Sequence, residues 1–399
     1  MPVQQVDTWS DPDLRSQPGV TTVRAPSVPW EMGAGDLFFT TNPGLEDIVV
    51  AEIAESCQAA GLPAGVAVTA PFGLAGHVLV RHPEAQSVVL PLAMRLRSIH
   101  HLLRPVAGFG VPAGDELATI RARLLSEPLP DLVGAPSFRV TTRRVGRHDF
   151  TSMDVERVAG AALVEHYGRP VNLERPAVHV RVDLFGGFCL LSLQVTDRAL
   201  SQRHHRIYQS RAALKATVAY ALLRLAGLRP DAEGAVLDPC CGSGTLLLEA
   251  AHLSGRLRVH GCDIHADAVA GARANLEAAG CLAQCQVRQL DLRCLDQVFA
   301  AGSFRAVVAN PPYGVKVGQT LHFPSFYRAL LEQSWRVLEP DGRLVVMVWR
   351  RGVFVRAVNH FGRFRLQHLR AVEAGGLFPH VFVLHRPATE PLASDLAGT

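Results

Sequence analysis

An apolar stretch at residues 235–237 ends in an acid and leads directly into a turn that contains Gly242 and Gly244. A second apolar stretch, residues 245–253, follows at once and has the length of a helix. A buried strand, a glycine turn and a helix in this order predict a parallel α/β sheet whose turn approaches a ligand closely. A dinucleotide fingerprint would have a third glycine where Leu247 stands, and a P-loop would have Lys after its last glycine. Both motifs are absent.

Acidic side chains end three successive predicted strands. Asp238 ends the first, Asp263 follows residues 257–262, and Asp291 follows residues 286–290. Because the carboxyl ends of parallel strands share one edge, we expect the three carboxylates to line one crevice. The second acid can accept hydrogen bonds from both hydroxyls of a ribose, and the third can accept one from an adenine amine. A helix N-cap or a surface turn is the alternative for each acid taken singly.

The loop Asn310-Pro311-Pro312-Tyr313 follows a fourth predicted strand, residues 304–309, and faces the same crevice. A nucleobase amine is a poor nucleophile because its lone pair is delocalised into the ring. The side-chain oxygen of Asn310 and the carbonyl of Pro311 can accept both amine hydrogens and turn the lone pair toward an electrophile. Tyr313 offers a ring on which an extruded base can stack. Together with an adenosyl site, this loop indicates methyl transfer from S-adenosylmethionine to a nucleobase nitrogen; a plain Pro-Pro turn is the structural alternative.

Three motifs resemble those of the THUMP-domain RNA methyltransferases, and the best match is the branch that makes N2-methylguanosine in the tRNA acceptor stem. They are Arg211-Ala212-Ala213-Leu214-Lys215-Ala216-Thr217, Asp238-Pro239-Cys240-Cys241-Gly242-Ser243-Gly244-Thr245 and Asn310-Pro311-Pro312-Tyr313-Gly314. Residues 38–46 are similar to the family's opening segment, and residues 138–152 are similar to its THUMP core. The resemblance covers residues 36–386. It departs from the family after Gly314, where relatives often carry an acid and an Arg and this chain has Val315 and Lys316.

The resemblance implies an enzyme that methylates the exocyclic N2 of a guanosine in tRNA, at position 6 of the acceptor stem. The Asn-Pro-Pro-Tyr motif also occurs in adenine-N6 enzymes, so guanine rests on the overall resemblance. Three alternatives stay open: a guanine-N2 enzyme of ribosomal RNA, an adenine-N6 enzyme of nucleic acid, and a catalytically silent RNA-binding protein that keeps the fold. The intact set of three acids and Asn310 argues against the silent protein.

The predicted site residues form three groups. The catalytic residues are Asn310, Pro311 and Tyr313. The residues expected to hold S-adenosylmethionine are Asp238, Cys240, Gly242, Gly244, Thr245, Asp263, Ile264, Asp291, Leu292 and Asn310. The expected RNA contacts are Arg139, Arg143, Arg144, Arg147, Arg203, Arg206, Lys215, Lys316, Arg350 and Arg351. The first four of these contacts lie in the THUMP-like part, which in the family holds the single-stranded acceptor end of tRNA.

Charge is unevenly distributed along the chain. Residues 201–399 contain 23 basic and 15 acidic side chains, whereas residues 1–200 contain 17 and 21. From Arg343 to Arg370 there are seven arginines and no acid, interleaved with aromatic residues. This pattern favours contact with nucleic-acid phosphates near the catalytic loop. A solvated basic face without a ligand is the alternative.

Composition narrows the class of protein further. The polar, proline-rich start lacks the apolar core of a signal peptide, and no apolar run approaches a membrane span. The eight cysteines form no Cys-x-x-Cys pair, which favours free thiols in a reducing cytoplasm over a zinc site. We therefore expect a cytoplasmic monomer with tRNA as its partner, with no metal and no membrane association.

The order of the predicted elements gives an α/β protein with several domains. We expect a disordered tail (1–35), a ferredoxin-like α+β unit (36–100), a THUMP RNA-binding domain (101–200), a linker (201–215) and a Rossmann-like class I methyltransferase domain (216–390) with a seven-stranded, mostly parallel sheet. The helices expected before the linker are 46–59, 91–97, 116–125 and 154–166, and the strands are 37–41, 66–70, 77–81, 137–142, 178–184 and 189–196.

Overall fold

The computed structural model describes residues 21–22, 32–33, 35–63, 65–84, 87, 89–210, 213–315 and 318–388. The predicted tail therefore lies largely outside the described residues, as does Lys316. Among the described residues the chain divides into two compact units. We call residues 18–41 and 49–200 the amino-terminal unit, and residues 42–48 together with 201 onward the carboxy-terminal unit.

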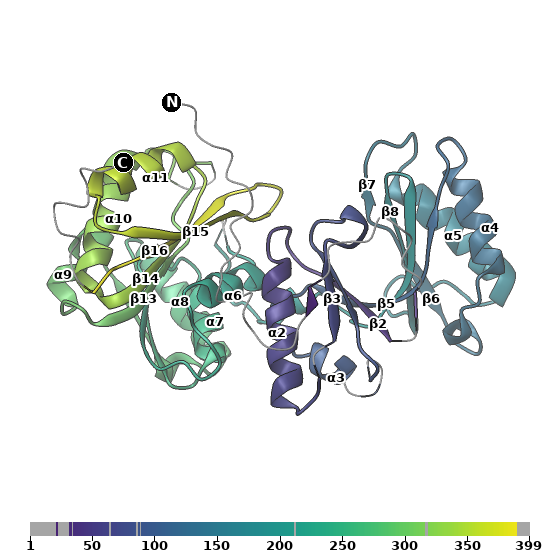
Figure 1. The fold of residues 1–399 in the computed structure, drawn as a ribbon, viewed down its shortest axis with the longest axis horizontal. Coiled ribbons are helices and arrows are strands. Elements are labelled where there is room, and N and C mark those ends of the chain that lie inside the picture. Colours follow the sequence, from purple (N-terminus) through teal and green to yellow (C-terminus); the bar gives the residue numbers. More distant parts are fainter. Residues whose placement is uncertain are drawn as a thin grey trace. The chain divides into compact units, whose positions relative to one another are not determined.

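One mixed sheet organises the amino-terminal unit (Figure 1). Its strands are β1 (Thr21–Thr22), β2 (Asp36–Thr40), β3 (Val66–Thr69), β4 (His77–Arg81), β5 (His101–Gly110), β6 (Phe138–Thr141), β7 (Arg144–Val145), β8 (Val178–Phe185) and β9 (Phe188–Gln194). They lie in the order β1-β3-β4-β2-β5-β9-β8-β6, with β7 paired to β8. β5 is hydrogen-bonded to β2 on one side and to β9 on the other. The two segments expected to be separate domains, divided at residue 100, thus share one sheet and one compact unit.

Helices cover this sheet: α2 (Glu46–Ala59), α3 (Leu90–Ala93), α4 (Glu116–Ser126) and α5 (Ser152–Tyr167), with 3-10 turns η1 (Pro71–Gly73), η3 (Pro130–Leu132) and η4 (Leu200–Gln202). α5 begins with a capping box between Thr151 and Asp154, and its C-terminus is capped by Gly168, which adopts a left-handed conformation. Apolar residues of α4 and α5 share a core with β6 and β8, among them Leu124, Leu163 and Val182. The helix expected over 91–97 is shorter, because α3 ends at Ala93.

The carboxy-terminal unit contains a seven-stranded sheet, as the sequence predicts. Its strands are β10 (Gly234–Asp238), β11 (Leu257–Asp263), β12 (Cys285–Gln289), β13 (Phe304–Ala309), β14 (Leu338–Val348), β15 (Arg365–Ala371) and β16 (His380–His385). They lie in the order β12-β11-β10-β13-β14-β16-β15. The first five are parallel, and β16 runs antiparallel to both of its neighbours.

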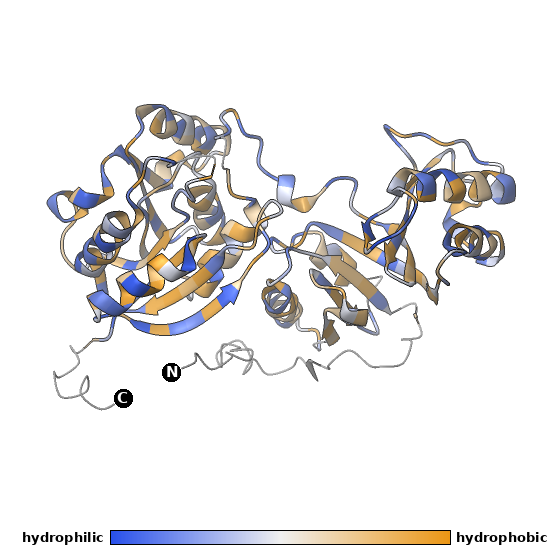
Figure 2. Cartoon of the chain, turned by 90° about the horizontal axis from the view of Figure 1, so that it is seen from above, coloured by the Kyte–Doolittle hydropathy of each residue, from blue (hydrophilic) through white to orange (hydrophobic). Residues whose placement is uncertain are grey.

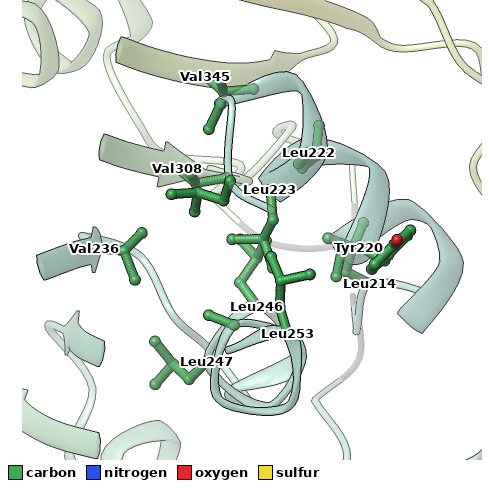
Figure 3. Packing of buried hydrophobic residues seen from close by; sticks show 14 of the residues in the cluster. Leu214, Tyr220, Leu222, Leu223, Val236, Leu246, Leu247, Leu253, Val308 and Val345 are labelled. Carbon is green, nitrogen blue, oxygen red and sulfur yellow. The ribbon is translucent and has the colours of Figure 1, made fainter. Parts of the chain in front are cut away.

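Side chains of these strands alternate between two cores. Val236, Val308 and Val345 pack on one face with residues of α6 (Ala216–Leu225), α7 (Thr245–Leu253) and α8 (Ala266–Ala278), as Figure 3 shows for α6 and α7. Leu237 and Val307 point to the other face, which is covered by α9 (Leu295–Val298), α10 (Phe323–Val337) and α11 (Arg351–Phe361), with 3-10 turns η5 (Leu282–Gln284) and η6 (Leu292–Cys294) in the connections. Burial on both faces explains why β10, β13 and β16 are nearly continuous apolar runs, and orange stretches mark such runs in Figure 2. The edge strands β12 and β15 contain more polar residues.

A short early segment, Asn42–Ile48, belongs to the carboxy-terminal unit. Leu45 and Ile48 are buried in the same core as α6 and α7. A β-carbon at Gly44 would lie 2.2 Å from the carbonyl oxygen of Ala371, so this position requires glycine. Among the described residues, no helix is both long enough and apolar enough to span a membrane.

Candidate active site

Four strands place polar side chains at one edge of the carboxy-terminal sheet. β10 ends at Asp238 and β11 at Asp263, while Asp291 comes shortly after β12 and Asn310 directly after β13. These strands are parallel neighbours, with β10 between β11 and β13. The three acids and Asn310 therefore lie along the same carboxyl edge, the usual ligand site of such sheets.

The glycine turn connects β10 to α7. Gly242 and Gly244 have positive φ angles of 52° and 79°, and Gly244 caps the N-terminus of α7. A β-carbon at Gly244 would lie 3.1 Å from that of Ala272 on α8, so the turn packs closely against the next helix. The hydroxyl of Thr245 is buried and has no hydrogen-bond partner among the described residues. A helix N-terminus and an unsatisfied hydroxyl thus point to a polar ligand at this turn.

Asp238 is fully enclosed at the base of this turn. Its Oδ1 accepts a hydrogen bond of 3.0 Å from the backbone N–H of Cys240. Burial raises the pKa of Asp238 to about 8; the Cys240 hydrogen bond acts against this shift and the nearby Asp263 adds to it. A carboxyl that is costly to ionise alone would be stabilised by a ligand that brings hydrogen-bond donors or positive charge.

The other two acids already have partners in the protein. The Asp263 oxygens accept from the N–H groups of Gly242 (2.9 Å) and His265 (3.0 Å). Both oxygens of Asp291 accept from Arg293, and this pairing lowers the pKa of Asp291. Each carboxylate oxygen has two lone pairs, so both side chains keep capacity for a ligand. An adenine amine at Asp291 would share those oxygens with Arg293, which the sequence did not indicate.

Three further residues predicted for the cofactor flank these acids. Ile264 follows Asp263 and is 52% exposed, Leu292 is buried at the start of η6, and Cys240 is half-buried. Burial raises the pKa of the Cys240 thiol, and the neighbouring acids add to this effect. Cys240 therefore remains a neutral thiol that lines the site.

The loop that contains the predicted catalytic residues has an internal hydrogen bond. The hydroxyl of Tyr313 donates to Oδ1 of Asn310 over 2.9 Å. Burial raises the pKa of Tyr313, so its hydroxyl stays protonated and remains a donor. Pro311 is buried, and Asn310 and Tyr313 are partly accessible. All three predicted catalytic residues thus lie in one short loop at the carboxyl edge of the sheet.

Arg350 lies beside this loop. It immediately precedes α11, and its guanidinium lies over the ring of Phe323 at 4.5 Å from the centroid. A β-carbon at Gly314 would lie 2.9 Å from that ring and 3.3 Å from the Arg350 guanidinium. A predicted RNA contact therefore adjoins the residue that follows Tyr313.

The sequence did not reveal how the predicted linker is anchored. Buried Glu249 on α7 forms an ion pair with Arg203 and lies 2.6 Å from Nε2 of His204. Fully buried Asn275 on α8 accepts from the N–H groups of Ile207 and Tyr208 and donates to the carbonyls of Tyr208 and Ser243. Asn275 thus ties the linker to the glycine turn. The sequence feature that could have indicated this anchoring is Glu249, an acid within the otherwise apolar run of α7.

The other predicted RNA contacts are distributed over both units. In the amino-terminal unit, Arg139 donates to the carbonyl of Leu173, Arg144 contacts His148, and Arg147 is exposed. Arg143 lies between β6 and β7. In the carboxy-terminal unit, Arg351 begins α11 and Lys215 lies 3.6 Å from Glu373.

Two of the predicted RNA contacts bind other groups of the protein itself. Arg203 pairs with Glu249, and Arg206 is half-buried and donates to the carbonyl of Leu214. Burial lowers the pKa of Arg206. We therefore assign these two guanidiniums to linker anchoring and keep the remaining arginines as RNA contacts to be tested.

Comparisons with known proteins find a family match within each of the two units. Residues 203–380 match the family described as RMKL-like, methyltransferase domain, and residues 121–194 match the THUMP domain. The tRNA (guanine(6)-N2)-methyltransferase of Thermus thermophilus is 38% identical over 348 residues, which cover 87% of this chain and 98% of that protein. The enzyme of the same name from Archaeoglobus fulgidus is 30% identical over 63% of this chain and 70% of its own length.

Solved structures agree with these matches. The crystal structure of TrmN from Thermus thermophilus has a TM-score of 0.72 and 37% identity, over 88% of this chain and 99% of that one. A Listeria monocytogenes protein described as a predicted N6-adenine-specific DNA methylase has a TM-score of 0.65 at 21% identity, over 87% and 95% of the two chains. At that identity the second likeness concerns the fold alone.

Proposed function

Because this chain belongs to the family of THUMP-domain RNA methyltransferases, we propose that it methylates the exocyclic N2 of guanosine 6 in the acceptor stem of tRNA. The choice of base and position is supported by the relative from Thermus thermophilus, which carries that specificity in its name and aligns over 98% of its own length. The choice of an amine acceptor is supported by the loop that begins at Asn310.

S-adenosylmethionine is the cofactor that fits the carboxyl edge. It would supply an electrophilic methyl group. The buried hydroxyl of Thr245, which has no partner in the described part of the chain, and the enclosed carboxyl of Asp238 offer polar groups at the glycine turn. Asp263 and Asp291 can accept from ribose hydroxyls and from an adenine amine, and Ile264 can cover an aromatic face.

Asn310 and Pro311 would prepare the base for reaction. Their side-chain and backbone oxygens accept the two N2 hydrogens, which turns the nitrogen lone pair toward the methyl group. Bound S-adenosylmethionine would supply the methyl carbon, and N2 would bond to this carbon as the sulfur–carbon bond breaks. The methylated nitrogen becomes acidic and loses its proton to water, so no strong general base is required. The observation that carries this proposal is the alignment of Asn310 by Tyr313 at the edge that holds the glycine turn.

A paired guanosine must leave the stem before it can react. Its N2 amine is hydrogen-bonded inside the duplex, so the base is extruded and can stack on Tyr313. The THUMP part, with Arg139, Arg143, Arg144 and Arg147, would hold the single-stranded acceptor end. The distance from that end to the catalytic loop would then select the nucleotide.

Labelled S-adenosylmethionine and defined RNA substrates test this proposal. We expect N2-methylguanosine in a tRNA transcript with guanosine at position 6, and no product when inosine, which lacks the amine, replaces it. Asn310→Ala, expected to be at least about a hundredfold slower, provides the low-activity control. Label in ribosomal RNA alone, or N6-methyladenine as the product, would move the assignment to the alternative substrates. If no RNA or DNA accepts label, the enzymatic function is wrong.

A further inference from the structure

A groove of about 480 Å³ lies between α10 and α11. Its ionisable residues are Arg328 and Glu332 on α10 and Arg356 and His360 on α11. Val353 and Phe361 form part of its apolar lining. On α11 these residues are spaced three or four apart, so they share one face of the helix.

The charges in the groove are unbalanced. Arg328 and Arg356 are exposed, and neither forms an ion pair with an acid of the described chain. Glu332 is the acid in the lining, which also contains two guanidiniums and an imidazole. Guanidiniums bind phosphate through two parallel hydrogen bonds, so such a groove favours a phosphate ligand.

The groove starts at the active edge of the sheet. Helices that follow parallel strands begin near the carboxyl ends of those strands. Arg328 and Arg356 both lie in the first two turns of their helices, α10 and α11. At the head of α11, Arg350 adjoins Gly314 of the catalytic loop. From Arg350 to His360 the basic residues extend over about 15 Å of helix, leading away from Tyr313.

We propose that this groove binds the phosphate backbone of the RNA strand next to the extruded nucleotide. The two arginines contact phosphates, and the apolar side chains of Val353 and Phe361 lie against ribose. Such contacts fix the register of the RNA on the enzyme without reading its sequence. The inference rests on the proposed function and adds a second contact surface beside the catalytic loop.

Binding of a tRNA transcript to Arg328→Gln/Arg356→Gln provides the test. Two other exposed arginines, Arg258 and Arg305, lie at the amino ends of β11 and β13, so Arg258→Gln/Arg305→Gln is the matched control. We expect the groove variant to bind tRNA about tenfold or more weakly at fixed salt. The slope of log affinity against log salt should fall by about 1.4 to 1.8, since each lost phosphate contact removes about 0.7 to 0.9. Cofactor affinity should not change.

Equal tRNA affinity and equal salt slope in the groove variant and the control variant would overturn this inference. That result is distinct from failure of the proposed function, which would appear as absence of methylation by the unaltered enzyme. A loss of affinity for one RNA sequence only would also contradict the groove, because backbone contacts weaken binding to every sequence alike.

Discussion

The hydroxyl of Tyr313 donates a hydrogen bond to Oδ1 of Asn310, the atom that the proposed reaction uses to accept an amine hydrogen. An amide oxygen has two lone pairs, so it can accept from Tyr313 and from the base together. The tyrosine therefore fixes the direction of the Asn310 amide before the substrate arrives. In the proposed reaction its hydroxyl would align Asn310 and its ring would stack on the base.

Tyr313→Phe separates these two roles because it keeps the ring and removes the hydroxyl. We expect the single-turnover rate to fall about five- to tenfold, the value of one neutral hydrogen bond, with little change in RNA affinity. Asn310→Ala should lower the same rate by about a hundredfold or more while cofactor affinity stays near normal. Rapid-quench measurements at saturating RNA would check both values. An unchanged rate in Tyr313→Phe would show that the hydroxyl does not align Asn310.

Asp263→Ala should weaken cofactor binding by about tenfold or more, because ribose hydroxyls lose their acceptor. The change also leaves the N–H groups of Gly242 and His265 without their partner. Asp267→Ala is a suitable control, since Asp267 is an exposed acid in the first turn of α8. Titration calorimetry with S-adenosylmethionine measures the difference. If both variants bind like the unaltered protein, Asp263 does not hold the cofactor.

Asp238 predicts a dependence of stability on pH. Its pKa is about 8 in the folded protein, compared with 3.8 for an unperturbed aspartate carboxyl. The folded state therefore holds a proton that the unfolded state releases, and the free energy of unfolding falls as pH rises from about 4 to about 8. In Asp238→Asn this contribution is absent. Denaturant unfolding across that pH range gives the free energy of unfolding of both proteins. The difference between the two free energies should change with pH, and a constant difference would contradict the raised pKa of Asp238.

Asn275→Ala should loosen the linker from the glycine turn. Four backbone groups would lose their partner, among them the carbonyl of Ser243 between the two glycines. We expect destabilisation of about 3 kcal/mol or more and weaker cofactor binding. Asn275→Asp keeps both acceptor bonds but loses the two donated ones, so its cofactor affinity should be intermediate. Thermal unfolding with and without cofactor distinguishes a local from a general effect. Equal cofactor affinity in the unaltered protein and both variants would contradict a link between the linker and the glycine turn through Asn275.

The THUMP part is tested by Arg143→Ala/Arg144→Ala. We expect this variant to lose methylation of whole tRNA while cofactor affinity stays unchanged, because the acceptor end is no longer held. Arg121→Ala/Arg157→Ala is the control, since these exposed arginines lie on α4 and α5 of the same unit. Trimming the 3′ end of the tRNA should reproduce the loss with the unaltered enzyme. Full activity on trimmed tRNA would contradict selection of the nucleotide by its distance from the acceptor end.

Elements with a strong local pattern were predictable from sequence. The predicted bounds of α2, α7 and β13 coincide with those of the structure. β5 was missed because Pro105 and two glycines lower its strand propensity. It forms because β2 and β9 flank it, and its register shifts next to Pro105. The domain boundary was predicted at residue 100 because β5, which joins the strands on both sides of that residue, was not recognised.

In the candidate site, too, some residues could be predicted from the local sequence and others could not. Strand ends and a glycine turn are local features, so the positions of Asp238, Asp263 and Asn310 could be predicted. The partners of Glu249 and Asn275 lie far away along the chain, from 32 residues for Ser243 and Asn275 to 68 residues for Ile207 and Asn275. No local pattern identifies such pairs. They depend on the folded positions of α7 and α8.

Asn42 donates to the side chain and the backbone carbonyl of Glu373 and accepts from Thr217, although 331 residues separate it from Glu373. Since the chain is made from its amino end, this early segment has to wait until nearly the whole protein has left the ribosome. The amino-terminal unit can fold during that interval. Its residues 49–200 are inserted in the sequence between the two parts of the carboxy-terminal unit. Cleavage after residue 48 would therefore remove part of the catalytic core, and a fragment starting at residue 201 would expose apolar surface that Leu45 and Ile48 normally cover.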